Sequence, residues 1–103
     1  MKLTDLANGR SCTVRGPNCN GDHRTTVSAH FRSQRLGAGM AQKPDDLFCA
    51  FACSTCHDWV DGRLHIKGFT REEARHYHAL GVLETQKWLL DAGYVHTGKR
   101  GEA

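Results

Sequence analysis

Residues 47–57 read LFCAFACSTCH, in which a short apolar run at 47–52 leads directly into two cysteines separated by two residues. A continuous apolar run of this length predicts a buried strand, and a short helix is expected to follow it over about 53–62. A second pair, Cys12 and Cys19, is separated by six residues and encloses the turn sequence GPN at 16–18. The two pairs therefore predict a knuckle of chain that is tied to the start of a helix.

The cysteine pairs predict a structural zinc site with Cys12, Cys19, Cys53 and Cys56 as its four ligands. Zinc favours soft ligands at tetrahedral angles, and a chain of 103 residues has a core small enough to gain from a metal staple. In a reducing compartment clustered cysteines bind metal more often than they form disulfides, a preference that secretion would reverse. A thioredoxin-like redox motif would need a βαβ setting that the sequence does not show. Cys49, inside the apolar run, is expected to be a small buried hydrophobe.

Composition and charge set few limits on function. The formal net charge is +3 before the seven histidines are counted, which permits a polyanionic partner without demanding one. No window approaches the roughly 20 apolar residues of a membrane span, and the first residues lack a run of signal-peptide length. We therefore expect a single domain over residues 1–103, located in the cytoplasm and without a membrane partner.

The chain as a whole predicts an α+β fold in which a strand-loop-strand-helix core, about 12–63, precedes a long helix. Residues 25–31 are rich in β-branched side chains and predict the first strand, and the glycine-bearing stretch after it predicts a long loop. Thr70 and Glu73 form a capping box for a helix over about 70–92. The first eleven residues are expected to be a polar leader or a short helix, and the last seven a frayed tail. Apolar residues recur along the long helix at helical spacing, namely Ala74, Tyr77, Gly81, Val82 or Leu83, Trp88 and Leu89.

Two histidines stand out in this framework, because His30 ends the first predicted strand and His57 follows the last cysteine directly. Their placement resembles the HNH endonucleases, whose ββα-metal unit carries a histidine on its first strand, an asparagine before its second and a histidine after a Cys-x-x-Cys pair. That resemblance covers roughly residues 12–63. The whole chain is more closely similar to the YbcO-type small prophage proteins, a family classed as nucleases, through AHFR at 29–32, KP at 43–44, ACSTCHD at 52–58 and TQKWL at 85–89.

The resemblance implies a fold and a mechanism. It implies a zinc-stapled treble-clef or HNH-like ββα-metal core, to which the predicted C-terminal helix is added. His30 would be the general base that takes a proton from water, a task that suits an imidazole because it can be uncharged at neutral pH. His57 would hold one divalent ion, Mg²⁺ or a similar metal, with Asp61 on the same helical face and Asp46 in the place of the asparagine. The substrate would be DNA, in the cytoplasm of a bacterial host.

DNA binding needs cations near such a site, and Arg32, Arg35 and Lys43 lie in the predicted connecting loop. Contacts of this kind hold phosphates without reading bases, so we expect little preference for a particular DNA sequence. The protein is expected to be a monomer or a homodimer. The remaining histidines are expected to face solvent or to form local hydrogen bonds: His23, His65, His76, His78 and His96.

Other interpretations of the same residues stay open. His30 on its own would more often be a hydrogen-bonded structural residue than a catalyst, and His57 could replace Cys12 or Cys19 as a zinc ligand. Many HNH sites place an acidic metal ligand directly before the base, whereas this chain has Ala29 there. The main rival is a non-catalytic zinc-binding module that binds DNA or a phage or host recombination protein. A third interpretation is a structural phage protein whose site has decayed.

Overall fold

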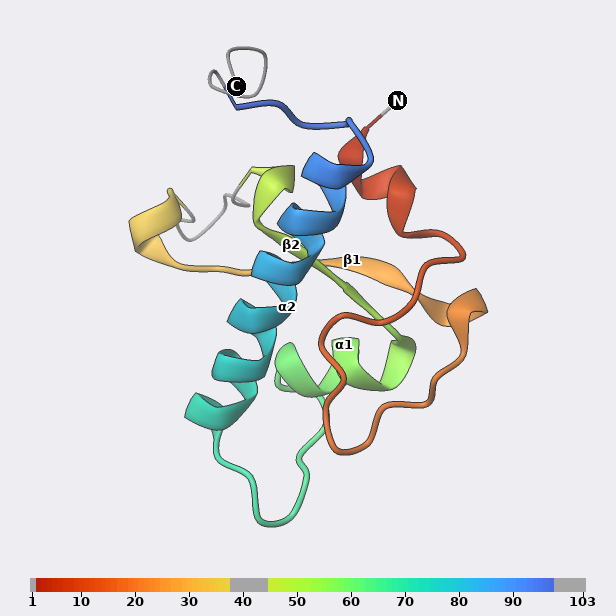
Figure 1. Ribbon diagram of the computed structural model, residues 1–103. Coiled ribbons are helices and arrows are strands. Elements are labelled where there is room, and N and C mark those ends of the chain that lie inside the picture. The colour runs from red at the N-terminus through yellow and green to blue at the C-terminus, as the bar shows by residue number, and fades with distance from the viewer. Residues whose placement is uncertain (1, 38–44, 98–103) are drawn as a thin grey trace.

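The structure, a computed structural model, describes residues 2–37 and 45–97. This part of the chain contains four regular elements in the predicted α+β order: β1 (Val27–His30), β2 (Cys49–Ala52), α1 (Ser54–Val60) and α2 (Arg71–Asp91) (Figure 1). Four short 3-10 helices accompany them: η1 (Leu3–Ala7), η2 (His23–Thr25), η3 (Gln34–Leu36) and η4 (Asp46–Phe48). Both α-helices begin and end within two residues of the predicted bounds. Neither described helix combines the length and apolar character that a membrane crossing needs.

β1 and β2 form an antiparallel hairpin whose last pair, next to the connecting loop, joins His30 to Cys49. Both strands are shorter than predicted, because η2 ends inside 25–31 and η4 occupies the start of 47–52. A 3-10 turn keeps its hydrogen bonds local, so those residues do not join the ladder. The two strand predictions are correct in type and wrong in length.

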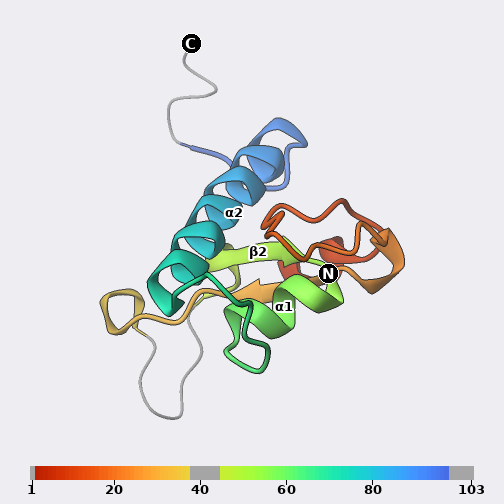
Figure 2. The same cartoon turned by 90° about the horizontal axis from the view of Figure 1, so that it is seen from below.

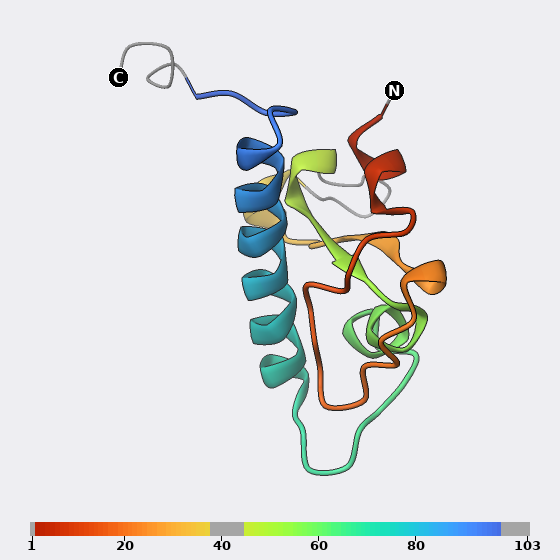
Figure 3. The same cartoon turned by 45° about the vertical axis from the view of Figure 1, so that its right-hand side comes forward.

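Helix α2 forms a layer on one face of the hairpin, and η1 lies on the other side (Figure 3). Close approach depends on Gly81, where a Cβ would lie 3.1 Å from the Cβ of Ala50 and 3.2 Å from Val14. Of the two alternatives for the inward face of α2, Val82 is 7% exposed and Leu83 is 61% exposed. Val82 is therefore the residue that faces the hairpin.

Two buried polar residues of α2, His78 and Thr85, lie on the inward face of the helix but are not among the apolar residues that were predicted for it. His78 was expected to face solvent or bond locally, and this is wrong: its buried ring donates from Nε2 to the Ala29 carbonyl at 2.9 Å. Burial lowers the pKa of His78, which keeps the ring neutral. Both stand one helical turn from residues of the predicted apolar face, namely Ala74 and Gly81, but a pattern built from apolar residues alone passes over polar side chains. The other histidines of that prediction are exposed as expected: His23, His65, His76 and His96.

Thr85 joins three segments at the outer edge of β2. Its hydroxyl accepts the Phe51 N–H at 3.1 Å and lies 2.9 Å from the hydroxyl of Thr13. Thr13 in turn donates its own N–H to the Phe51 carbonyl at 2.7 Å, so both outward-facing backbone groups of Phe51 are satisfied. A buried polar group left without a partner costs about 1–3 kcal/mol, so this contact stabilises the packing of α2 on the hairpin.

The predicted capping box begins α2. The Thr70 hydroxyl accepts the Glu73 N–H at 3.1 Å, and the Glu73 carboxylate accepts the Thr70 N–H at 2.9 Å. Arg71 then reaches back to α1 and donates to the carbonyls of Trp59 and Val60 at 2.7 and 2.9 Å. Because these carbonyls belong to the last turn of α1, Arg71 both caps α1 and fixes its position against α2.

Replacement of Thr85 by valine tests the contact at the edge of β2. Thr85→Val removes the hydroxyl at nearly constant volume and leaves the Phe51 N–H without its partner, so we expect the free energy of unfolding to fall by about 1–3 kcal/mol. Thr85→Ser keeps the hydroxyl and should lose less. Urea denaturation of metal-saturated protein, followed by circular dichroism, measures both variants. Wild-type stability in Thr85→Val would contradict the assigned hydrogen bond.

Candidate metal centre and active site

The four predicted zinc ligands lie together in the structure. The Sγ atoms of Cys12, Cys19, Cys53 and Cys56 all lie within 4.8 Å of one another, and those of Cys19 and Cys53 are 3.7 Å apart. Sulfurs bound at about 2.3 Å at the corners of a tetrahedron are about 3.8 Å apart, so the arrangement fits a four-thiolate metal site. No disulfide forms among the five cysteines, all of which belong to the described residues.

Backbone N–H groups point at these sulfurs. Cys53 directly follows β2 and is the N-cap of α1, where its Sγ accepts the Cys56 N–H at 3.4 Å. In the knuckle, the Arg15 N–H donates to Cys12 Sγ and the Gly16 N–H donates to Cys56 Sγ, both at 3.4 Å. A hydrogen bond from the Cys56 thiol lowers the pKa of Cys12 to about 4 and raises that of Cys56. The cluster therefore favours a thiolate, the form that binds metal.

The knuckle packs tightly against α1. A Cβ on Gly16 would lie 2.6 Å from the ring of Trp59, so the close approach requires glycine. Trp59 is buried, and its ring contacts Phe69 and Tyr77 edge to face, at centroid distances of 5.8 and 5.2 Å. The aromatic side chains here belong to the core, and this core supports one wall of the cysteine cluster.

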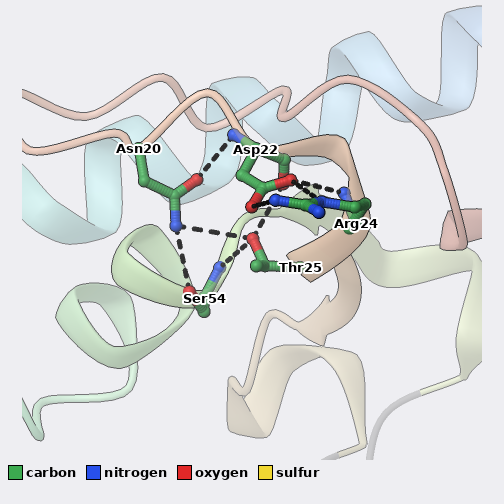
Figure 4. A network of polar contacts seen from close by, with 5 residues as sticks. All are labelled: Asn20, Asp22, Arg24, Thr25 and Ser54. Carbon is green, nitrogen blue, oxygen red and sulfur yellow. Dashed lines mark hydrogen bonds and ion pairs between the residues drawn. The ribbon is translucent and has the colours of Figure 1, made fainter.

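A polar network joins the segment after Cys19 to the start of α1 (Figure 4). The amide nitrogen of Asn20 donates to the Ser54 hydroxyl at 3.0 Å and to the Thr25 hydroxyl at 3.4 Å. The amide oxygen of Asn20 accepts the Asp22 N–H at 2.8 Å, and the Ser54 N–H donates to the Thr25 hydroxyl at 3.1 Å. Because Ser54 is the first residue of α1, the network holds the two halves of the cysteine cluster in register.

A polar cleft lies on the side of the hairpin away from α2, and it collects the predicted base and two of the predicted metal ligands. His30, His57 and Asp61 all line this cleft, whose volume is about 460 Å³. His57 Nε2 lies 3.6 Å from the nearer carboxylate oxygen of Asp61, one helical turn further along the chain. At this separation the two side chains can share one cation.

The remaining predicted ligand, Asp46, does not line this cleft and contacts His30 instead. Its Oδ1 lies 3.0 Å from His30 Nε2. Because a carboxylate accepts and does not donate, the neutral imidazole carries its proton on Nε2 and its lone pair on Nδ1. Among the described residues, two sets of donors meet within 4.8 Å: the four cysteines, and His30 with Asp46 and Cys49. The structure thus separates Asp46 from His57 and Asp61.

Alternation along β1 explains why Ala29 precedes His30. Ala29 is 1% exposed and pairs across the hairpin with Ala50, whose Cβ approaches Gly81 of α2. Successive side chains of a strand point to opposite faces, so His30 points away from α2. A carboxylate at position 29 would be buried against α2 and would not enter the cleft.

The N-terminal segment supplies cleft residues that the sequence patterns did not predict. Thr4, Asp5 and Asn8, in η1 and directly after it, line the cleft together with the histidines. The Ser28 hydroxyl donates to the Thr4 carbonyl at 3.0 Å and holds η1 against β1, across 24 positions of sequence. No spacing rule relates residues so far apart, so the sequence contained no local signal for these oxygen donors.

The cationic side chains of Arg32 and Arg63 lie near the two histidines. Arg32 is exposed and lines the cleft, and Arg35 is exposed on η3. Lys43 lies outside the described residues. Arg63, which follows α1, places its guanidinium 3.4 Å from Nδ1 of His57. The cleft therefore combines imidazole, carboxylate and guanidinium groups, a set that suits a phosphate ester.

Metal analysis of a ligand variant tests the cysteine cluster. We expect wild-type protein to retain one tightly bound metal ion per chain after dialysis, and Cys19→Ser to lose both that ion and its fixed tertiary structure. Structural zinc contributes an apparent binding free energy of about 10–16 kcal/mol to the folding of small domains. Elemental analysis and near-ultraviolet circular dichroism report the two losses, with Cys49→Ala as a matched control that keeps the ion. Retention of the ion by Cys19→Ser would contradict the site.

The chain is similar in sequence and in fold to known proteins. The family model described as "Putative nuclease YbcO" matches residues 1–94. Proteins of that name from Escherichia coli (strain K12) and from Enterobacteria phage 82 are each 41% identical over 96 residues, 90% of this chain and 95% of theirs. A solved structure described as that of a putative bacteriophage protein from Escherichia coli K-12 has a TM-score of 0.72 and 36% identity, and the match covers 87% of this chain and 98% of that one. The chain therefore belongs to the YbcO family, which is named for a nuclease.

Proposed function

We propose that this protein is a metal-dependent endonuclease of the HNH type that hydrolyses phosphodiester bonds in DNA. The observation that carries the proposal is the cleft that collects His30, His57 and Asp61 beside a ββα unit and a four-cysteine cluster. Membership of a family named for a nuclease supports nucleic acid as the substrate class. The phage and bacterial relatives support the cytoplasm of a bacterial host as the place of action.

His30 is assigned the role of general base. Its side chain is 15% exposed, so water can reach a ring that its neighbours hold in place. With Nε2–H donated to Asp46, the lone pair of Nδ1 accepts a proton from water. The oxygen of that water attacks phosphorus as the bond from phosphorus to the 3′ oxygen breaks. The products are a 5′-phosphate and, once the leaving oxygen has taken a proton from solvent, a 3′-hydroxyl.

His57 and Asp61 are assigned the binding of a divalent cation such as Mg²⁺. They offer an imidazole nitrogen and a carboxylate oxygen 3.6 Å apart, and Asp5 and Asn8 bring further oxygens to the same cleft. Oxygen donors are the ligands that hard cations prefer. A bound cation supplies positive charge for the scissile phosphate and for the leaving oxygen. Asp46 is assigned to the ring of His30 and not to this cation.

The four cysteines are assigned a structural zinc ion in a treble-clef arrangement. The knuckle at Cys12 and Cys19 supplies one pair of ligands, and the start of α1 supplies the other. Thiolates select zinc over magnesium or calcium. Four protein ligands leave no open position for a substrate, so this ion serves the fold and not the reaction.

Plasmid nicking tests the catalytic assignment. We expect the protein to nick supercoiled plasmid with added Mg²⁺, Mn²⁺ or Ni²⁺, and His30→Ala of equal zinc content to nick about 10²–10⁴-fold more slowly. His76→Ala is the matched control, because His76 is an exposed histidine of α2 outside the cleft. Gel analysis of the nicked fraction against time gives the three rates.

The outcomes of this assay separate the competing functions. Equal rates for His30→Ala and wild type would contradict the role of His30. If both proteins are silent but still bind DNA, the chain is a non-catalytic zinc-binding module. If folded, zinc-loaded protein neither nicks nor binds DNA, the chain is a structural phage protein whose site has lost its activity.

The salt dependence of DNA binding tests the cationic rim of the cleft. One phosphate contact contributes about 0.9 to the slope of log Kobs against log salt concentration on duplex DNA. We therefore expect Arg32→Ala to reduce that slope by about 0.9 and to weaken binding on all sequences alike. Lys87→Ala is the control, because Lys87 pairs with Asp91 and does not line the cleft. Fluorescence anisotropy without divalent metal measures both, and an unchanged slope for Arg32→Ala would place the phosphate elsewhere.

A further inference from the structure

We propose that His30, Asp46 and Cys49 form a second, weaker binding site for a thiophilic divalent cation such as Zn²⁺. One nitrogen, one oxygen and one sulfur donor meet there, all within 4.8 Å of one another. The set lies at the loop end of the hairpin, whereas the four-cysteine cluster lies at the other end, where β2 enters α1. The two donor sets share no residue, so each can bind an ion independently.

Strand register brings the three donors together. His30 and Cys49 are direct partners in the antiparallel hairpin, so their side chains project from the same face. Asp46 begins η4, three residues before Cys49, and the turn of this 3-10 helix carries its carboxylate to 3.0 Å from His30 Nε2. Both strands must keep this register for the set to exist, which makes it a product of the fold and not of a contiguous motif.

The chemistry of the set suits zinc better than magnesium. Imidazole nitrogen, carboxylate oxygen and thiolate sulfur are all established zinc ligands, at about 2.0–2.3 Å from the ion. Two such ligands of a tetrahedral ion are about 3.3–3.6 Å apart, so His30 and Asp46 already stand close to the required separation and Cys49 needs a small side-chain movement. Three protein ligands leave a fourth position for water. One thiolate in place of four makes this the weaker of the two sites.

An ion can reach the set from solvent. The Asp46 side chain is 42% exposed and that of His30 is 15% exposed, whereas Cys49 is buried at 3%. The open side is therefore formed by the carboxylate and the imidazole, and the sulfur forms the floor. This arrangement provides the entry path that a metal site needs.

Occupation of the site has a consequence that rests on the proposed nuclease function. A metal bound to Nε2 of a neutral imidazole leaves the ring proton on Nδ1. His30 could then no longer accept a proton from water, so zinc in excess of the structural ion would inhibit the Mg²⁺-supported reaction. The same residue would thus serve catalysis when its partner is Asp46 alone and block it when the ion is bound.

Cobalt spectroscopy tests the site without reference to activity. Protein loaded with one equivalent of zinc is titrated with Co²⁺, and a thiolate-to-cobalt absorption band in the near ultraviolet reports a new sulfur ligand. We expect the band in wild type and in His57→Ala, because Co²⁺ at His57 and Asp61 has no sulfur ligand and gives no such band. Cys49→Ala should lose the band, and Asp46→Ala, which changes a half-exposed residue, should weaken the apparent affinity about 10–100-fold.

Absence of the band in wild type would overturn the proposal. So would its persistence in Cys49→Ala, which would show exchange of cobalt into the four-cysteine cluster. Zinc inhibition of plasmid nicking provides the second arm: the zinc concentration for half inhibition should rise about tenfold or more in Cys49→Ala, each variant being normalised to its own rate. If wild type does not nick plasmid at all, the nuclease proposal fails and the cobalt titration still decides the metal site.

Discussion

The mutual approach of four cysteine sulfurs is the constraint on which the rest of the molecule depends. Cys53 is at once the residue after β2, the N-cap of α1 and a member of the cluster, so the position of the sulfurs fixes the end of the hairpin and the start of the helix together. The direction of α1 then decides where His57 projects. A domain of this size has a small apolar core, and a metal that joins sequence-distant segments supplies stability that packing alone does not.

The hairpin divides the molecule into a packing face and a chemical face. Ala29 and Ala50 meet α2, where small side chains and Gly81 let helix and sheet approach closely. The alternate positions, Ser28 and His30, line the cleft together with residues of η1 and α1. Figure 2 shows the arrangement of α1, α2 and the two strands from below. Packing against α2 and lining of the cleft do not compete for the same residues, because successive side chains of a strand point to opposite faces. An acidic residue at position 29 is incompatible with this division, so the carboxylates of the cleft come from η1 and from the end of α1.

The contact between His30 and Asp46 connects the proposed reaction with the proposed second metal site. As a hydrogen bond it orients the imidazole and leaves the lone pair on Nδ1, the proton acceptor of the proposed reaction. With Cys49 below it, the same pair becomes part of a metal-ligand set. The hydrogen-bonded pair and the proposed metal-bound set need the same register of β1 on β2. Which of the two forms is populated would depend on the concentration of a thiophilic cation. The proposed base thus stands beside a carboxylate and a thiol, two groups that bind thiophilic metals.

The sequence by itself determined the features that depend on local spacing: two cysteine pairs, a capping box at Thr70, the order of strands and helices, and a histidine on each side of the second strand. Local hydrogen bonding and periodicity carry those signals over a few residues. Only the tertiary structure decided the hydrogen-bond partners of Asp46, His78 and Thr85, and the contribution of η1 to the cleft. Each of these depends on a hydrogen bond or packing contact between segments far apart in the chain, and no periodicity of one segment records the position of another.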